Sequence, residues 1–400
     1  MVNYVFLSVY FYSVPNLRFN NDPYKKYNLY EFATRVTRKN KDNVSNLPLT
    51  ISAQYGLVDQ VSFFNKTVAS KDMSGYYLLK NGEFAYNKSY SNDYPWGAIK
   101  RLDLYDMGCL STLYICFKTN DNIVNSNYLV HYFESSKWHK QVADIAGEGA
   151  RNHGLLNIGV NDFFNTKHAV PTIENQIKIA GFLDLIEKRI QTQIKIINDL
   201  VLQKKCIISS LLKSVQDNEK IMLKDILFDY NIKTTINNEY PVLSSTASGM
   251  YLQSEYFNKE ASSDNTIGYK IIPRGYCTYR SMSDTGLFTF NMQELVEKGI
   301  VSPAYPVFSA NDDYINEFII LYLNNSSYIK KQILELKSGG TRFALPFSTL
   351  CTLKIPKLDK EKQLSLIKTI TAFERKIENE EMLLKALHQQ KNFLLNNMFI

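Results

Sequence analysis

The chain has few cysteines, and their positions form no metal-binding or disulfide pattern. Its 400 residues include five cysteines and five histidines, with no CxxC pair. The cysteines are Cys109, Cys116, Cys206, Cys277 and Cys351. An odd, scattered set argues against a disulfide framework and against a structural zinc site. The sequence therefore predicts a protein of a reducing compartment, the cytoplasm, with no metal of its own.

Long apolar runs are also missing from the sequence. No run approaches the ~20 apolar residues that a membrane-spanning helix needs. The mean hydropathy of −0.24 and the hydrophobic content of 45% are ordinary for a soluble protein, so no membrane partner is expected. The opening residues MVNYVFLSVYFYS are apolar but lack the basic segment and small-residue cleavage site of a secretory signal. We assign no role to residues 1–13.

Catalytic and cofactor-binding motifs are absent or broken. There is no G-x-x-x-x-G-K-[ST] phosphate loop, and no Ser/His/Asp, Cys/His or paired-carboxylate set can be assembled. Asn21–Tyr24 is one proline short of the amino-methyltransferase signature Asp-Pro-Pro-Tyr, and we interpret it as a surface turn. The glycines of Gly147–Gly154 follow an expected helix, whereas a dinucleotide fingerprint must follow a strand. We predict no catalytic residue, and we expect His153 and His168 to serve packing or to face solvent.

The most informative feature is a long stretch with helical periodicity, Ile173–Lys213, which contains no proline and one glycine. Its apolar residues recur at alternating steps of four and three. They are Ile179, Leu183, Ile186, Ile190, Ile197, Leu200, Ile207 and Leu211. A seam of this period predicts a long helix packed along a partner helix.

The same ladder recurs 187 residues later, from Leu366 to Met398. Its two polar interruptions recur in register, since Gln193 matches Glu380 and Lys204 matches Lys391. The partner helix is therefore predicted within the same chain. We expect the polar positions either to fix the register of the two helices or to face docked subunits.

The segments that precede the two helices also match each other. PLTISAQYGL at Pro48 corresponds to PVLSSTASGM at Pro241, GYYLLKNGEFAYNKS at Gly75 to GYKIIPRGYCTYRSM at Gly268, and GCLSTLYICFKTNDN at Gly108 to GIVSPAYPVFSANDD at Gly299. Asn81-Gly82 predicts a tight hairpin that joins strands at Tyr76–Leu79 and Phe84–Tyr86. Repeats of this length indicate duplicated domains rather than solenoid units.

The predicted fold class is therefore α+β. Two duplicated α/β domains are separated by two long antiparallel coiled-coil helices, with pseudo-two-fold symmetry. The predicted boundaries are residues 1–171 for the first domain, 172–214 for the central helix, 215–356 for the second domain and 357–400 for the C-terminal helix. Four hundred residues are enough for each domain to build its own core.

Basic, amide and tyrosine side chains occupy equivalent loops of the two domains. Arginine and lysine suit guanine and phosphate, asparagine and glutamine suit adenine, and tyrosine stacks or contacts phosphate. A net charge of +7 agrees with a DNA partner. The predicted DNA-binding residues are Arg38, Lys39, Gln54, Tyr55, Lys88, Tyr90 and Arg101 in the first domain and Lys233, Arg274 and Arg280 in the second. For each of them, the alternative is a solvated surface residue.

Arg151 and Arg342 form a separate pair of candidates. Each lies in a glycine-rich turn, Gly149-Ala150-Arg151 and Gly340-Thr341-Arg342, and the turn is repeated between domains that otherwise diverge. The repetition suggests either a shared phosphate contact or a structural clamp where domain and helix meet. Both interpretations remain open at this point.

With these features the chain resembles the specificity (S) subunit of type I restriction–modification systems. The resemblance runs from VPNLRF at Val14 to the C-terminal helix. Its most specific segments are EGARNHGLLNIGVNDFF at 148–164, VPTIENQIKIAGFLDLIEKRI at 170–190, LQKK at 202–205 and SGGTRFALPFSTLCTLKIP at 338–356. The resemblance implies two target recognition domains that read the half-sites of a bipartite DNA target, and two spacer helices.

The resemblance also implies the partners. Two methyltransferase subunits would dock on the helices, and restriction/translocase subunits would join the larger complex. S-adenosylmethionine, ATP and Mg²⁺ would belong to those subunits, with no cofactor in this chain. Because the two domains differ in their loops, the double-stranded DNA target should be asymmetric. The competing classes are an enzyme in its own right, such as a fused endonuclease–methyltransferase, and a purely structural coiled-coil adaptor.

Overall fold

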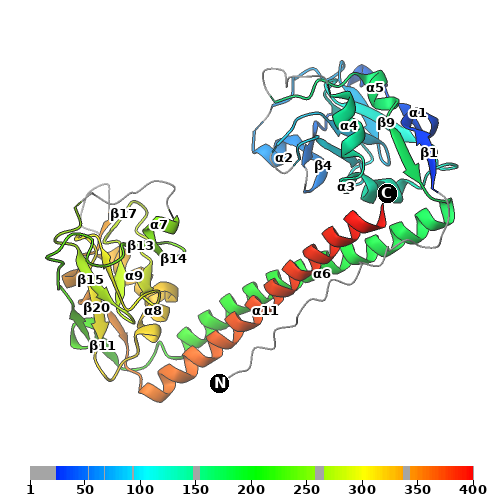
Figure 1. The fold of residues 1–400 in the computed structure, drawn as a ribbon. Helices are drawn as coiled ribbons and strands as arrows, with labels where there is room; N and C mark the ends of the chain where they lie inside the picture. The colour runs from blue at the N-terminus through cyan, green and yellow to red at the C-terminus, as the bar shows by residue number, and fades with distance from the viewer. Residues whose placement is uncertain are drawn as a thin grey trace. The chain divides into compact units, whose positions relative to one another are not determined.

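The computed structural model describes residues 24–399 except 53, 67, 92–93, 147–153, 257–264 and 337–342. The chain divides into two compact units. The first combines the chain up to Ile194 with the segment from Leu383 onward, and the second runs from Lys195 to Met382. Each unit thus contains one α/β domain and part of each of the two long helices (Figure 1).

The domain of the first unit contains a four-stranded antiparallel sheet with the order β2-β9-β6-β7. The two-stranded pairs β1-β10, β3-β4 and β5-β8 surround it. In chain order the elements are β1 (Lys25–Asn28), α1 (Leu29–Phe32), β2 (Ala33–Arg35), the 3-10 turn η1 (Lys41–Asn43), β3 (Leu49–Ser52), β4 (Gly56–Asp59), α2 (Gln60–Phe64), β5 (Tyr77–Lys80), β6 (Phe84–Asn87), β7 (Ala98–Arg101), β8 (Met107–Leu110), β9 (Ile115–Thr119), α3 (Ser126–Glu134), α4 (His139–Ile145), α5 (Val160–Phe164) and β10 (Lys167–Val170).

The core of this domain is rich in aromatic side chains. Phe84 of β6 stacks on Phe117 of β9 with ring centroids 5.3 Å apart, and Tyr86 stacks on Phe163 of α5 at 4.9 Å. Trp138 meets Tyr86 edge-on, and all five of these side chains are buried. Each such ring removes a large apolar area from water, so these contacts fix the helices against the sheet.

The domain of the second unit repeats this topology. Its four-stranded sheet has the equivalent order β12-β20-β16-β18, and the pairs β11-β22, β13-β14, β15-β19 and β17-β21 accompany it. The elements are β11 (Lys220–Met222), the 3-10 turn η2 (Leu223–Asp225), β12 (Leu227–Asp229), β13 (Leu243–Thr246), β14 (Gly249–Leu252), α7 (Gln253–Tyr256), β15 (Lys270–Pro273), β16 (Cys277–Tyr279), β17 (Met282–Ser283), β18 (Phe290–Met292), β19 (Lys298–Val301), β20 (Val307–Ala310), α8 (Asn316–Asn325), α9 (Ser327–Glu335), β21 (Phe343–Ala344), α10 (Phe347–Leu350) and β22 (Lys354–Pro356). The predicted duplication is confirmed.

The structure corrects the alignment of the two halves at one segment. A Cβ on Gly108 would lie 2.5 Å from Cδ1 of Leu49, and a Cβ on Gly299 would lie 2.5 Å from Cδ1 of Leu243. Leu49 therefore corresponds to Leu243, one residue away from the match that aligned Pro48 with Pro241. The sequence alignment was based on the proline that both segments contain. The structural alignment is set by the leucine that packs closely against a glycine in each domain.

The predicted hairpin at Asn81-Gly82 is wrong. The chain does turn there, with Gly82 at φ 83° and the Glu83 amide donating to the Lys80 carbonyl over 3.0 Å. However, β5 pairs with β8, whereas β6 pairs with β7 and β9. Asn-Gly fixes the turn locally, but cross-strand packing decides which strands pair.

His168 of β10 is a packing residue, in agreement with the expectation, whereas His153 lies outside the described residues. His168 is 2% exposed, and its imidazole has Nδ1 2.9 Å from the Tyr132 hydroxyl and Nε2 2.8 Å from the Thr166 hydroxyl. Burial disfavours the charged form and lowers the pKa of His168 from 6.5 to about 4.

The first unit is therefore expected to lose stability in acid. Between about pH 6.5 and 4 the unfolded chain binds a proton at His168 that the folded chain does not bind, so stability falls as the pH falls, by up to about 3 kcal/mol. Urea unfolding as a function of pH measures this slope. His168→Gln should reduce it, and His388→Gln, at an exposed position of the C-terminal helix, should leave it unchanged. An unchanged slope in His168→Gln would contradict the assignment.

The two long helices are present as predicted: α6 spans Ile173–Ser214 and α11 spans Lys360–Met398. In the first unit the apolar ladder of α6, which includes Leu183 and Ile190, belongs to the same buried cluster as Leu394 near the end of α11. In the second unit the end of α6 packs with the start of α11, for example Leu212 with Leu366. In the described part of the chain, no helix combines the length and the apolar content that a membrane-spanning segment needs.

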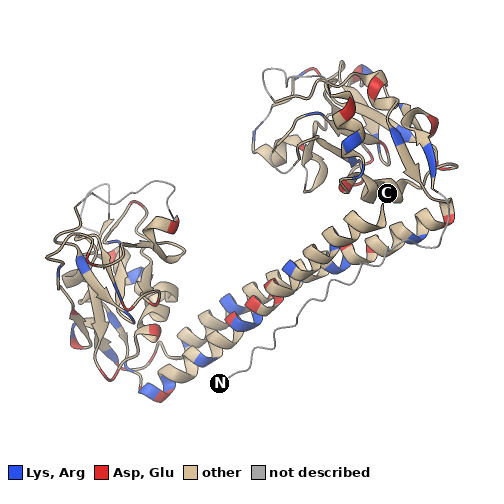
Figure 2. Ribbon diagram, in the orientation of Figure 1, with Lys and Arg blue, Asp and Glu red and all other residues tan. Residues whose placement is uncertain are grey.

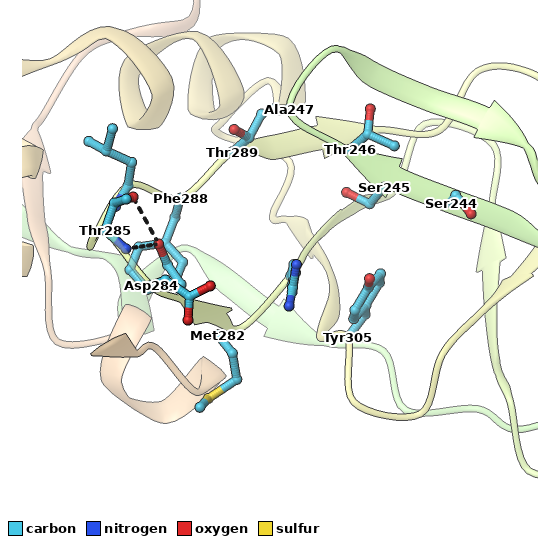
Figure 3. Close-up of a pocket in the computed structure, with 13 residues that line it drawn as sticks. Ser244, Ser245, Thr246, Ala247, Met282, Asp284, Thr285, Phe288, Thr289 and Tyr305 are labelled. Atoms are coloured by element: carbon cyan, nitrogen blue, oxygen red, sulfur yellow. Dashed lines mark hydrogen bonds between the residues drawn. The ribbon is translucent and has the colours of Figure 1, made fainter. Parts of the chain in front are cut away.

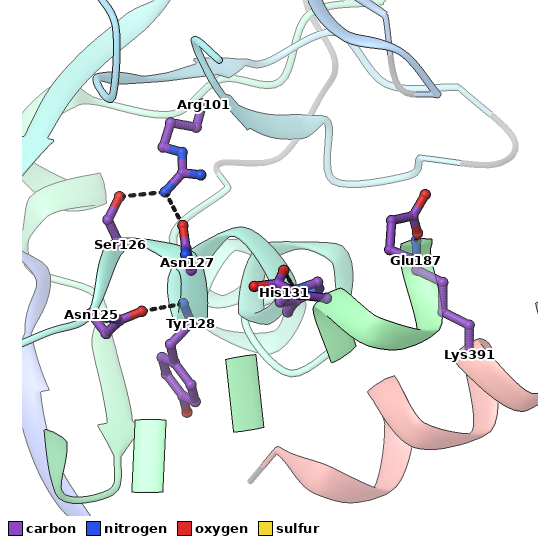
Figure 4. Close-up of polar contacts among 9 residues, drawn as sticks. Arg101, Asn125, Ser126, Asn127, Tyr128, His131, Glu187 and Lys391 are labelled. Carbon is purple, nitrogen blue, oxygen red and sulfur yellow. Dashed lines mark hydrogen bonds and ion pairs between the residues drawn. The ribbon is translucent and has the colours of Figure 1, made fainter. Parts of the chain in front are cut away.

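The two lysines among the polar interruptions of the ladder, Lys204 and Lys391, each pair with a glutamate of the opposite helix. Lys391 Nζ lies 2.7 Å from Glu187 Oε2 in the first unit (Figure 4), and Lys204 Nζ lies 3.1 Å from Glu374 Oε1 in the second. The two pairs are related by the 187-residue repeat. Lys204 comes after Glu187 in α6, but its partner Glu374 comes before Lys391 in α11, as antiparallel helices require. Of the two roles expected for these lysines, the contacts favour that of fixing the register.

Reversal of one charge should therefore destabilise the first unit, and reversal of both should restore it. Lys391→Glu is expected to lower the free energy of unfolding by up to about 1 kcal/mol, because it places two carboxylates together. The double variant Glu187→Lys/Lys391→Glu should recover most of this loss in a double-mutant cycle followed by urea unfolding. Lys385→Glu, at an exposed position of α11, is the matched control. Equal losses in the single and double variants would show that the pair does not couple.

Candidate nucleic-acid interface

In the first domain, the tip of the β3–β4 hairpin presents two of the predicted DNA-binding residues. Gln54 and Tyr55 form the turn, and both are exposed, with Tyr55 at 67%. The Tyr55 amide donates to the Ser52 hydroxyl over 3.2 Å, and Gly56 closes the turn at φ 82°. An aromatic ring held by its backbone and open to solvent is suited to stacking on a base or sugar.

Lys88 and Tyr90 lie in the loop that follows β6. The Tyr90 amide donates to the Gly154 carbonyl over 3.0 Å, and the Leu156 amide donates to the Lys88 carbonyl over 2.9 Å. The loop is thereby tied to the chain that follows Gly154, while the Tyr90 side chain remains 47% exposed. These contacts fix the loop through its backbone and leave the Tyr90 ring accessible to a ligand.

Arg38 and Lys39 lie at the surface but already have partners. One Nη of Arg38 lies 2.7 Å from Glu83 Oε2 and donates to the Leu78 carbonyl over 2.9 Å. Lys39 Nζ donates to the Gly75 carbonyl over 2.8 Å and lies 4.4 Å from the centroid of the Tyr77 ring. Both cations could reach DNA only by exchanging these contacts, so their DNA-binding role stays a prediction.

Arg101 of β7 is more fully engaged (Figure 4). Its guanidinium lies 2.6 Å from Asp103 Oδ1 and donates to Ser126 Oγ and Asn127 Oδ1, both at 2.8 Å. Only 17% of the side chain is exposed. It joins the end of β7 to the start of α3, where Asn125 caps the helix by accepting from the Tyr128 amide. These contacts support a structural role for Arg101 more than a ligand-binding one.

In the second domain, Lys233 and Arg274 lie near opposite ends of β15. Lys233 stands opposite Lys270 in an isolated antiparallel bridge, and burial lowers the pKa of Lys270, an effect that Asp229 opposes. Arg274 Nε lies 3.1 Å from Glu297 Oε1, and both side chains are at least half exposed. Such exposed ion pairs are weak and can be exchanged for a phosphate.

Arg280 differs from these residues because it lines a cavity of about 480 Å³ (Figure 3). Three segments of the second domain form its wall: the end of the β13 strand, the β17 region and Tyr305. The lining residues are Ser244, Ser245, Thr246, Ala247, Arg280, Met282, Ser283, Asp284, Thr285, Leu287, Phe288, Thr289 and Tyr305. The described lining therefore combines hydroxyl groups, one cation and one carboxylate with the apolar side chains of Met282, Leu287 and Phe288.

The sequence prediction missed every lining residue except Arg280. Serine and threonine occur in many surface loops, and the three segments are far apart in the chain, so no local pattern marks them. Arg151 and Arg342 lie outside the described residues, as do residues 1–13, and no position is assigned to them. Among the described residues, no cluster of His, Cys, Asp or Glu could hold a metal ion.

Acidic and basic residues alternate over both units. Figure 2 shows lysine and arginine interspersed with aspartate and glutamate in the two domains and along the long helices. The net charge of +7 is thus distributed over the chain. The net charge by itself therefore gives no selective contact with DNA, which depends on local groups.

Comparison with known proteins gives structural matches only. The sequence matches no protein-family model and no curated protein. One matching structure was determined to explain the complex assembly and conformational transition of the type I restriction–modification system. It shares 14% identity over 93% of this chain and 96% of its own, with a TM-score of 0.59. The HsdS subunit from Thermoanaerobacter tengcongensis shares 13% identity over 93% and 95%, with a TM-score of 0.54.

This chain has the fold of these two proteins. The likeness covers both domains and both long helices, because more than nine-tenths of each chain is matched.

Proposed function

We propose that this chain is the DNA-specificity subunit of a type I restriction–modification complex. In this proposal each domain reads one half-site of a bipartite, asymmetric double-stranded target. The observation that carries it is the duplication: two domains of one topology, each joined to two long helices, differ in the loops that present side chains. A repeated framework fixes two reading surfaces, and different loops give them different targets.

The loops supply groups of the kinds that read DNA. Tyr55 and Tyr90 offer exposed rings in the first domain, and Arg280 lies in a hydroxyl-lined cavity in the second. Arginine, amide and hydroxyl groups form hydrogen bonds with base edges, and tyrosine contacts bases and phosphates. The two surfaces have different chemistry, which supports an asymmetric target.

The partners in this proposal are two methyltransferase subunits docked on the helices, with restriction/translocase subunits in the larger complex. The helices expose apolar side chains at positions related by the repeat. Ile177 and Leu364 are 53% and 40% exposed, and Ile196 and Leu383 are both 39% exposed. Repeated apolar positions suit two copies of one partner. S-adenosylmethionine, ATP and Mg²⁺ would be held by those subunits, and the complex would act in the cytoplasm.

Enrichment of DNA from a randomised duplex library tests the proposal directly. The full chain should select two short, different sequences separated by a fixed number of unselected base pairs, with affinity that falls as salt rises. In the host, loss of the gene should abolish DNA methylation at the same bipartite sequence. Selection of no sequence would point to a structural adaptor, and transfer of methyl groups by the purified chain alone would point to an enzyme.

A further inference from the structure

Arg280 is distinguished from the other described candidate arginines by its lack of a partner. Arg38, Arg101 and Arg274 each pair with a carboxylate. Within the part of the chain that the structure describes, the Arg280 guanidinium forms no hydrogen bond, ion pair or ring contact. Its side chain is exposed at the edge of the cavity, so its donors are available to a ligand that enters from solvent.

The charges of the cavity wall argue against a phosphate ligand. A phosphate site gathers several cations or amide donors, whereas the residues that the structure describes in this wall include one cation, Arg280, and one carboxylate, Asp284. The remaining polar groups are the hydroxyls of serine, threonine and tyrosine, which both donate and accept. A neutral ligand that carries both acceptors and donors fits this set better than an anion.

The edge of a G·C base pair in the major groove has these groups. Guanine O6 and N7 accept two hydrogen bonds from one guanidinium, and hydroxyl groups pair with either base. We propose that the Arg280 cavity reads a G·C pair in the half-site of the second domain, and that Arg280 selects the guanine. The inference rests on the proposed function and adds the chemical identity of one recognised base pair.

Library enrichment with variants of the full chain tests this assignment. The wild-type chain should select one G·C pair whose preference falls about tenfold or more in Arg280→Ala, while the other positions keep theirs. Arg280→Lys should keep the salt dependence of binding but show a weaker preference than the wild-type chain, because an ammonium group lacks the planar fork that makes two parallel hydrogen bonds. Lys331→Ala removes an exposed charge from α9 in the same domain and should change no base preference.

The outcomes separate this inference from the proposed function. If the wild-type chain selects a bipartite sequence and Arg280→Ala weakens all sequences equally, Arg280 is a phosphate contact and the inference is wrong. An unchanged preference in Arg280→Ala also overturns it while the proposed function stands. If the wild-type chain selects no sequence, both proposals fail.

Discussion

Replacement of Gln176 by leucine is expected to destabilise the first unit by about 3 kcal/mol or more. Gln176 is fully buried at the start of α6. Its Oε1 accepts from the Asn125 amide over 2.7 Å, and its Nε2 donates to the carbonyls of Pro171 at 2.8 Å and Ile123 at 3.3 Å. Leucine would remove the partner of three backbone groups that are buried or half-buried, each at a cost of up to about 1–3 kcal/mol.

The second unit provides an internal repetition of this experiment. Gln363, 187 residues later and also fully buried, accepts from the Ile315 amide over 2.9 Å and donates to the carbonyls of Asp313 and Leu358, both at 3.0 Å. Gln363→Leu should therefore cost about as much as Gln176→Leu. Both costs can be measured by urea unfolding, with Gln389→Leu at an exposed position of α11 as control. Losses within about 0.5 kcal/mol of the control, as for ordinary surface changes, would refute this role of the two glutamines.

Truncation of Phe399 to alanine is expected to lower the stability of the first unit by about 3–5 kcal/mol. Phe399 follows α11 and is 2% exposed. Its ring lies 5.3 Å from that of Tyr128 and 5.7 Å from that of Tyr132, both on α3, so alanine would open a cavity in an aromatic cluster. Hydrogen exchange of the α3 amides and urea unfolding would both report the loss.

The control for this prediction is a phenylalanine on α11. Phe393 is 45% exposed, and Phe393→Ala should cost well under half as much, because most of its area is already in contact with water. If the two variants were equally stable, the end of α11 would not belong to the core of the first unit. Faster exchange confined to the last turn of α11, with α3 unaffected, would lead to the same conclusion.

The candidate site was only partly predictable, for a reason visible in individual residues. Tyr55 and Tyr90 were predicted from loop position and are exposed. Arg38 and Arg101 were predicted from the same kind of position, yet each pairs with a carboxylate. Residue type and loop position are local properties, whereas the partner of a charge depends on which segments the fold brings together.

The sequence by itself determined the two long helices and the duplication. A helix places residues three and four apart on one face, so the spacing of the apolar residues shows which face of the helix packs. The repeat of 187 residues is likewise visible in the sequence alone. The tertiary structure alone decided the partners: Lys391 with Glu187, β5 with β8 in place of the expected hairpin, and the three segments around Arg280. These are contacts between residues distant in the chain, which depend on the packing of the whole domain.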